Sequence, residues 1–214
     1  WEAEQLGKKK VYKEPEPLDT TNLPDLPEGW IWATLETIAS IQLGKMLSPK
    51  AYESGLKQLP YLRNENVRWE SIDYSDVKWM GFKDTELEKY QLKPRDLLVC
   101  EGGEAGRCAI YKGEAEQYMY QKALHRVRVV EAVVLPELIQ FCMQHYVASK
   151  TIIPKPSETT IQHLPLEKMQ VLPFPLPSLA EQQQIVSEVE ARLSIIAQTE
   201  LEVEANLKRA ERLR

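Results

Sequence analysis

The sequence lacks the residue patterns that several common classes of enzyme require. No glycine-rich loop ends in Gly-Lys-Ser or Gly-Lys-Thr, so a P-loop nucleotide site is excluded. No Asn-Pro-Pro or Asp-Pro-Pro loop of the kind that holds a flipped adenine occurs, and no E-x-K nuclease triplet is present. We therefore find no catalytic constellation in the chain.

Cysteine and histidine are also scarce, with three of each in 214 residues. None of them has the spacing of a metal-binding motif, so no metal site is expected. Cys100 and Cys108 flank a glycine-rich turn and are predicted to lie across a hairpin as small apolar residues. The remaining ones are isolated and are interpreted as structural or surface residues: Cys142, His125, His145 and His163.

Long apolar runs are missing as well. No stretch approaches the roughly 20 apolar residues of a membrane span, and no signal peptide is recognisable. We therefore expect a cytoplasmic protein without a membrane partner. Because the sequence starts at Trp1 rather than methionine and stops within a helical pattern at Arg214, we also expect a fragment or one half of a longer protein.

The charge balance shows no excess of basic residues. The formal net charge is -5, and basic and acidic residues nearly cancel between residues 28 and 178. A protein that holds nucleic acid alone is usually strongly basic. The balance therefore favours either a protein-binding role or a module whose basic partners supply much of the phosphate affinity.

The most informative stretch is residues 159–186, because it joins a threonine-rich loop, a short apolar strand and a proline break. The strand is predicted at Met169–Phe174 and the break at Pro173–Pro177. Ser178 and Glu181 then form an S-x-x-E capping box, which predicts the start of a helix. This order ends a globular unit and begins a rod.

The predicted helix runs from Ser178 to the end of the sequence without proline or glycine. The helix would be roughly 50 Å long, and a small domain rarely buries the whole apolar stripe of such a helix. We therefore expect a partner helix. The alternative is a terminal helix packed on its own core. The apolar seam follows a heptad interrupted at Glu200: Val186, Val189, Leu193, Ile196, Val203, Leu207 and Ala210.

The remaining pattern predicts an α+β fold, with a single globular domain followed by a long C-terminal coiled-coil helix. Strands are expected at Leu97–Cys100, Cys108–Tyr111 and Leu124–Val130, with a helix beginning at Pro136 and a short one capped by Thr34. The proline-rich residues 1–27 are predicted to be an extended linker, residues 28–177 the globular domain, and residues 178–214 the coiled-coil helix.

A set of ordered motifs resembles the DNA-specificity subunits of type I restriction-modification systems. The motifs, in order along the chain, are LPEGW at 26–30, LGKMLSP at 43–49, YLRNENV at 61–67, DLLVCEGGEAGRCAIY at 96–111, YQKALHRVR at 120–128, and TTIQHLPLEKM with LPSLAEQQQIV before the helix. Glu158 stands where the family often has glycine. Each motif alone is weak, but their order is specific.

The resemblance implies a non-catalytic subunit with one target recognition domain and its conserved coiled-coil helix. Its expected partners are double-stranded DNA, a methyltransferase (modification) subunit, a restriction and translocase subunit, and a second recognition half or second copy bound through the coiled coil. The chain itself is expected to carry no cofactor, with S-adenosylmethionine, ATP and Mg on partner subunits. It would be the C-terminal half of a full subunit that reads one half of a bipartite target.

Polar loop residues are the candidate DNA contacts, because forked or bidentate side chains read bases while lysines and hydroxyls bind phosphates. Arg63, Asn64 and Asn66 are the strongest candidates for base reading. The other predicted contacts are Lys45, Ser48, Lys50, Arg107, Gln121, Lys122, Ser157, Thr159, Thr160 and Gln162.

Two alternatives to a DNA-recognition subunit stay open. A coiled-coil adaptor whose globular head binds protein would explain the near-neutral charge. An enzyme with an unfamiliar site is the third possibility. The polar loops between residues 61 and 162 favour the first interpretation.

Overall fold

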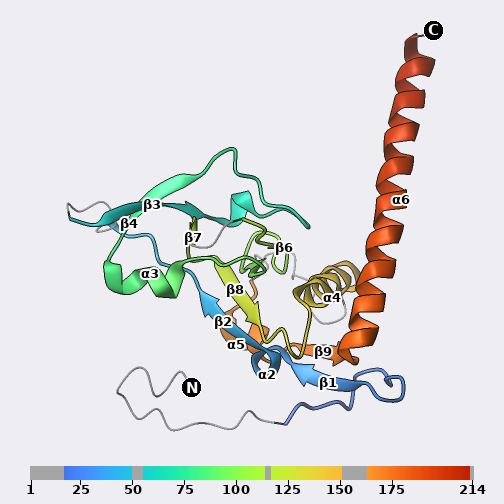
Figure 1. Ribbon diagram of the computed structural model, residues 1–214, viewed down its shortest axis with the longest axis horizontal. Coiled ribbons are helices and arrows are strands. Elements are labelled where there is room, and N and C mark those ends of the chain that lie inside the picture. Colours follow the sequence, from blue (N-terminus) through green and yellow to red (C-terminus); the bar gives the residue numbers. More distant parts are fainter. Residues whose placement is uncertain (1–16, 50–54, 114–116, 151–162, 213–214) are drawn as a thin grey trace.

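The computed structural model describes residues 17–49, 55–113, 117–150 and 163–212. Within these ranges an α+β domain carries one long helix that projects away from it (Figure 1). The expected fold class is confirmed.

A four-stranded antiparallel sheet forms the centre of the domain. Its strands lie in the order β2 (Ala39–Leu43), β8 (Leu124–Val129), β5 (Leu97–Cys100) and β6 (Cys108–Ile110). The three segments predicted as strands in this region are therefore confirmed. Both faces of the sheet are buried, which explains the continuous apolar runs of β5 and β6.

Helix α4 (Pro136–Ser149) covers one face of this sheet and starts with Pro136 as predicted. Its buried side chains join those of β5 and β8 in the main hydrophobic core. A smaller apolar cluster lies on the other face, where Cys100 packs beside Leu98 and Leu124. Burial raises the pKa of the Cys100 thiol to about 11, as expected for an unreactive packing residue.

A second sheet extends from that other face and forms the arm opposite the long helix (Figure 1). It contains β4 (Lys78–Phe82), β3 (Lys57–Leu62) and β7 (Met119–Tyr120), with β3 antiparallel to β4 and parallel to β7. Helix α3 (Asp84–Tyr90) follows β4, and the short 3-10 helix η2 (Asn64–Asn66) follows β3.

The predicted strand at Met169–Phe174 is placed differently. Met169 lies in helix α5 (Leu166–Gln170), and the strand β9 is Pro173–Leu176, which pairs with β1 (Ile31–Thr34). Two prolines fit β9 because this sheet has only two strands, so one side of each strand needs no ladder donor. The predicted helix after Thr34 is the single turn α2 (Leu35–Ile38), and Ala39 already begins β2.

The long helix α6 (Leu179–Arg212) begins at the predicted capping box. The backbone N–H of Ser178 donates to Glu181 Oε2 at 3.1 Å, and the Glu181 N–H donates to Ser178 Oγ at 3.4 Å. Only the first turns pack on the domain, where Gln182 and Val186 are buried beside α4. From residue 194 to 212 every position is exposed, so packing on its own core accounts for the first turns alone.

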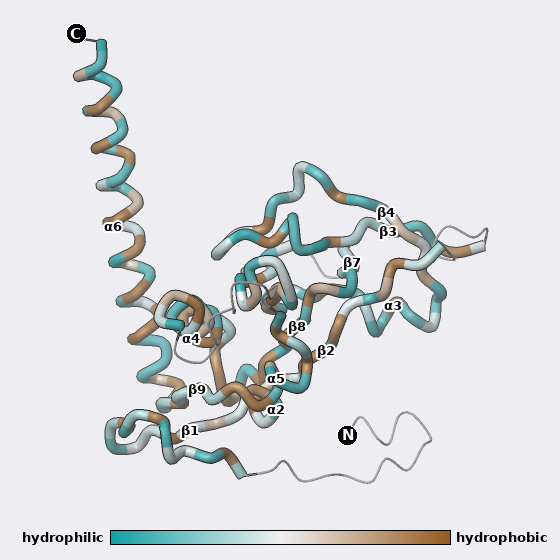
Figure 2. The backbone as a smooth tube through the Cα atoms, turned by 180° about the vertical axis from the view of Figure 1, so that it is seen from behind, coloured by the Kyte–Doolittle hydropathy of each residue, from teal (hydrophilic) through white to brown (hydrophobic). Residues whose placement is uncertain are grey.

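Apolar residues recur along the projecting part of α6 and alternate with hydrophilic residues (Figure 2). In the described ranges, no helix combines the length and the apolarity that crossing a membrane requires.

Candidate nucleic-acid interface

Four loops that are far apart in the sequence meet where strands of the two sheets end. We call residues 44–48, 63–66, 101–107 and 121–123 the loop-end surface. Backbone hydrogen bonds join these segments: Gln121 N–H to Leu62 O at 2.9 Å, Lys122 N–H to Lys45 O at 2.8 Å, and Glu101 N–H to Ala123 O at 2.9 Å. The four loops are therefore fixed to one another.

At Gly44, the backbones of two of these loops lie too close together for a side chain. A Cβ atom at this position would lie 2.3 Å from the carbonyl carbon and oxygen of Gln121. The glycine of the predicted glycine-lysine loop thus serves backbone packing between residues 44–48 and 121–123.

Asn64 and Arg107, two predicted contacts from different loops, are brought together on this surface. Asn64 Nδ2 donates to Gly102 O at 3.0 Å, and an Arg107 guanidinium N–H donates to Asn64 O at 3.0 Å. Arg107 also forms an ion pair with Glu104 at 3.0 Å, and 18% of its side chain is exposed. Glu104 is held in turn by Trp69 Nε1, which donates to its carboxylate at 2.8 Å.

Arg63 lies at the end of β3 between two carboxylates. Its guanidinium donates to Glu65 and to Asp76, and Lys78 Nζ lies 2.7 Å from Asp76 Oδ1. The Lys78 hydrogen bond is the main reason that the pKa of Asp76 is lowered. Only 21% of the Arg63 side chain is exposed, whereas both carboxylates are exposed.

Lys45, a predicted phosphate contact, is engaged inside the domain when no DNA is bound. Its side chain is only 14% exposed, and Nζ donates to Gly81 O at 2.8 Å and to Glu86 Oε2 at 2.6 Å. The ammonium also lies 4.7 Å from the centre of the Phe82 ring. Lys45 therefore joins the loop after β2 to β4 and α3.

The structure corrects the prediction that Asn66 reads bases. Its side chain is 2% exposed and inside the loop it closes. Asn66 Nδ2 donates to Asp73 O and Asp76 O at 2.9 and 3.2 Å, and Oδ1 accepts from the Arg63 N–H at 3.0 Å. With these bonds made, Asn66 positions the loop and has no free edge for DNA.

The other predicted contacts fall into two groups. Gln121 and Ser48 are partly exposed on the loop-end surface, and Lys122 is exposed there. The remaining predicted contacts lie outside the described residues: Lys50, Ser157, Thr159, Thr160 and Gln162.

Residues that follow the predicted threonine-rich loop are attached to the same surface. His163 forms a bridge with Gly102, and Leu164 N–H donates to Glu101 O at 2.7 Å. The buried His125 ring bonds Leu164 O through Nε2 at 2.9 Å. Burial is the main cause that lowers the pKa of His125, so the ring is held neutral. Sequence reasoning assigned no such role to His125.

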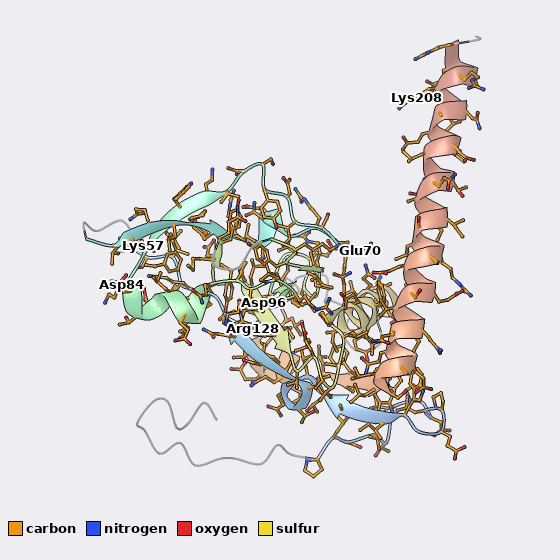
Figure 3. The ribbon with its side chains drawn as sticks, viewed as in Figure 1. Lys57, Glu70, Asp84, Asp96, Arg128 and Lys208 are labelled. Carbon is orange, nitrogen blue, oxygen red and sulfur yellow. The ribbon has the colours of Figure 1, made fainter. Side chains whose placement is uncertain are left out.

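The acidic partners of the arginines are the residues that sequence reasoning missed at this surface. Glu65 and Glu104 lie within the motifs YLRNENV and DLLVCEGGEAGRCAIY, and Asp76 lies outside the motifs, but nothing in the sequence pairs any of them with an arginine. A further arginine–carboxylate pair joins Asp96 to Arg128 at 2.7 Å within the domain (Figure 3). Among the described residues, no cluster of three or more His, Cys, Asp or Glu could hold a metal ion.

The predicted coiled-coil seam divides into two parts. Val186 is buried by the domain, so its assignment to an intermolecular seam is corrected, and Val189 and Leu193 are half-buried. The other seam residues project with α6 and are exposed: Ile196, Val203, Leu207 and Ala210.

Comparisons with known proteins agree with this arrangement. A family model described as the type I restriction modification DNA specificity domain matches residues 27–208. A chain from a study of complex assembly and conformational transition of the type I R-M system has a TM-score of 0.65 at 19% identity, over 89% of this chain and 45% of that chain. The HsdS subunit from Thermoanaerobacter tengcongensis has a TM-score of 0.57 at 15% identity, over 82% of this chain and 40% of that chain.

At these identities the solved structures establish a shared fold. The chain spans less than half the length of either of them. None of the curated proteins compared matches this chain.

Proposed function

The chain belongs to the type I restriction modification DNA specificity domain family, and from that membership we propose that it recognises a specific sequence in double-stranded DNA. It would direct an adenine methyltransferase and restriction complex to one half of a bipartite target. The observation that carries this proposal is the loop-end surface, where Arg63 and Asn64 from one loop converge with Arg107 from another on one rigid patch.

The chemistry of this patch suits readout of base edges. Arginine donates two hydrogen bonds to guanine in the major groove. Asn64 instead joins two of the loops, because its Oδ1 is buried and its Nδ2 donates to Gly102 O. Lys122 is exposed beside them and suits a phosphate contact. Arg63 and Arg107 are held by partners in the absence of DNA, so little conformational entropy is lost when they bind.

The projecting part of α6 supports the second element of the proposal, a partner helix. Ile196 is 53% exposed and Leu207 is 60% exposed, and both lie on the heptad seam. We propose that this seam pairs antiparallel with an equivalent helix, from the other half of a full subunit or from a second copy. A helix of 34 residues is about 50 Å long, which matches roughly 15 base pairs of unread spacer.

We propose that residues 1–27 form a linker, residues 28–177 a recognition domain and residues 178–214 a docking helix. In this scheme the domain selects the site and the helix binds the catalytic subunits. The methyltransferase subunit would bring S-adenosylmethionine, and the restriction subunit would use ATP and Mg.

A protein-binding adaptor is the second candidate, because the arginines of the loop-end surface are paired with carboxylates and the net charge is negative. An adaptor would bind the methyltransferase subunit equally well with and without DNA, and its complex would enrich no sequence from random duplexes.

The third possibility is that the chain is itself an enzyme, and assays of cofactor binding and methyl transfer test it. The purified chain should give no heat of binding with S-adenosylmethionine in a calorimetric titration and should not methylate DNA. Adding the modification subunit should produce sequence-dependent methylation. A stoichiometric binding signal from the isolated chain would contradict the proposed function.

A further inference from the structure

Arg63 is electrostatically neutralised within the domain. Its guanidinium contacts Glu65 and Asp76, and Asp76 also pairs with Lys78. These four side chains carry two positive and two negative charges, so the network has no net charge at neutral pH. An arginine that only anchored phosphate would gain nothing from two adjacent carboxylates.

A phosphate and a guanine edge respond differently to such a network. The phosphate carries a full negative charge and is repelled by the Glu65 and Asp76 carboxylates. The O6 and N7 atoms of guanine are uncharged acceptors, for which an N–H donor suffices. Flanking carboxylates therefore weaken sequence-independent binding more than they weaken contact with guanine.

The same carboxylates fix the direction of the guanidinium. Arg63 Nε is buried, and the head group is held from two sides by Glu65 and Asp76. Bidentate readout needs the planar fork in one orientation, and holding it in advance reduces the entropy lost on binding. Asp76 is itself positioned, because Lys78 binds its other oxygen.

We infer that Glu65 and Asp76 are positioning residues that determine specificity, by directing Arg63 toward an uncharged guanine edge and excluding phosphate. This inference rests on the proposed function, in which Arg63 reads a base. Arg107 provides a parallel case on the same surface, since Glu104 binds its guanidinium and Trp69 binds Glu104. The device also explains how a recognition domain functions with a near-neutral charge.

The test uses the full chain assembled with its methyltransferase subunit. Two duplexes of equal length and composition are compared: one enriched from random sequences by the wild-type complex, and one scrambled. Asp76→Asn is the variant. Glu131→Gln is the matched control, because Glu131 pairs with Arg95 at 2.9 Å and the substitution removes the same charge without touching Arg63.

Asp76→Asn should bind the scrambled duplex more tightly, with a salt dependence steeper by about one unit, because Arg63 becomes a phosphate contact. The ratio of enriched to scrambled affinity should fall about tenfold, within the roughly 5- to 150-fold discrimination of one bidentate contact. Asp76→Glu keeps the carboxylate and should retain most of the wild-type ratio. Glu131→Gln should change neither quantity.

A double substitution isolates the route of the effect. In the Arg63→Ala background, Asp76→Asn should no longer steepen the salt dependence. Equal ratios for Asp76→Asn and Glu131→Gln would overturn the positioning role while leaving the proposed function intact. A wild-type complex that enriches no sequence at all would instead remove the proposed function and, with it, this inference.

Discussion

Gln182 is the residue on which the rigid junction between the recognition domain and α6 depends most clearly. It is fully buried on the first turn of the helix. Its Oε1 accepts from the Leu135 N–H at 2.9 Å, and Nε2 donates to Val133 O at 2.9 Å and Pro177 O at 3.0 Å. One side chain thus joins α6 to the segment that leads into α4.

Gln182→Met keeps the length of the side chain and removes all three hydrogen bonds. Each bond contributes about 1 kcal/mol net, and a buried group left unpaired costs about 1–3 kcal/mol. We therefore expect the free energy of unfolding to fall by about 3–5 kcal/mol, since methionine recovers some apolar contact. For a chain of this size that corresponds to a decrease in Tm of about 10 °C.

Scanning calorimetry measures the decrease, and Gln183→Met is the control because Gln183 is exposed on the same turn. The control should change stability by no more than about 0.5 kcal/mol. Amide hydrogen exchange adds a local readout, in which the Leu135 N–H should exchange faster in Gln182→Met. If both variants unfold at the same temperature, the reasoning about this junction is refuted.

Further predictions concern the seam, Lys45 and His125. Ile196→Glu with Leu207→Glu should abolish assembly in light scattering, whereas Ile195→Glu, exposed beside the seam, should leave it unchanged; equal behaviour would contradict the seam. Lys45→Met should lower the free energy of unfolding by about 1–3 kcal/mol, because Glu86 loses its cation. A lower salt dependence of DNA binding by this variant would show that Lys45 also contacts phosphate. Because burial holds the pKa of His125 below 6.5, the unfolded chain binds more protons at acidic pH, and stability should decline below pH 6.5. His125→Asn should flatten this decline in denaturant titrations, and an unchanged slope would exclude His125 as its source.

Elements specified by local patterns could be predicted from the sequence. The S-x-x-E box places the start of α6 at Leu179, and the glycine-rich turn between Cys100 and Cys108 predicts the β5–β6 hairpin. Alternation along Leu124–Val129 identifies β8. In each case the residues that determine the element lie within a few positions of it.

The sequence predicts β9 several residues too early, because the two prolines of this strand are typical of a break between elements. Prolines are compatible with a strand only when one side of it needs no hydrogen-bond donors, and that depends on β1, more than 130 positions away. Met169 is likewise ambiguous, because a buried apolar side chain is compatible both with a strand and with a short helix.

The candidate site could be predicted only as a set of loops. Sequence identifies Lys45 as a cation in a loop, but its partner Glu86 is 41 positions away. Asn66 and Arg63 are equally polar in the sequence, yet one is buried and the other is held at the surface. Which polar side chains remain available for DNA is decided by such distant contacts, and no local pattern contains them.

The most direct test of the central claim is selection from random duplexes by the chain assembled with its methyltransferase subunit. Bound duplexes are separated by gel shift, sequenced, and compared between the wild type and Arg63→Ala. We predict that the wild type enriches a defined sequence and that Arg63→Ala loses preference at one position of it, at a cost of about 1–3 kcal/mol. Enrichment of no sequence, with unchanged binding of the methyltransferase subunit, would contradict the account and identify the chain as an adaptor.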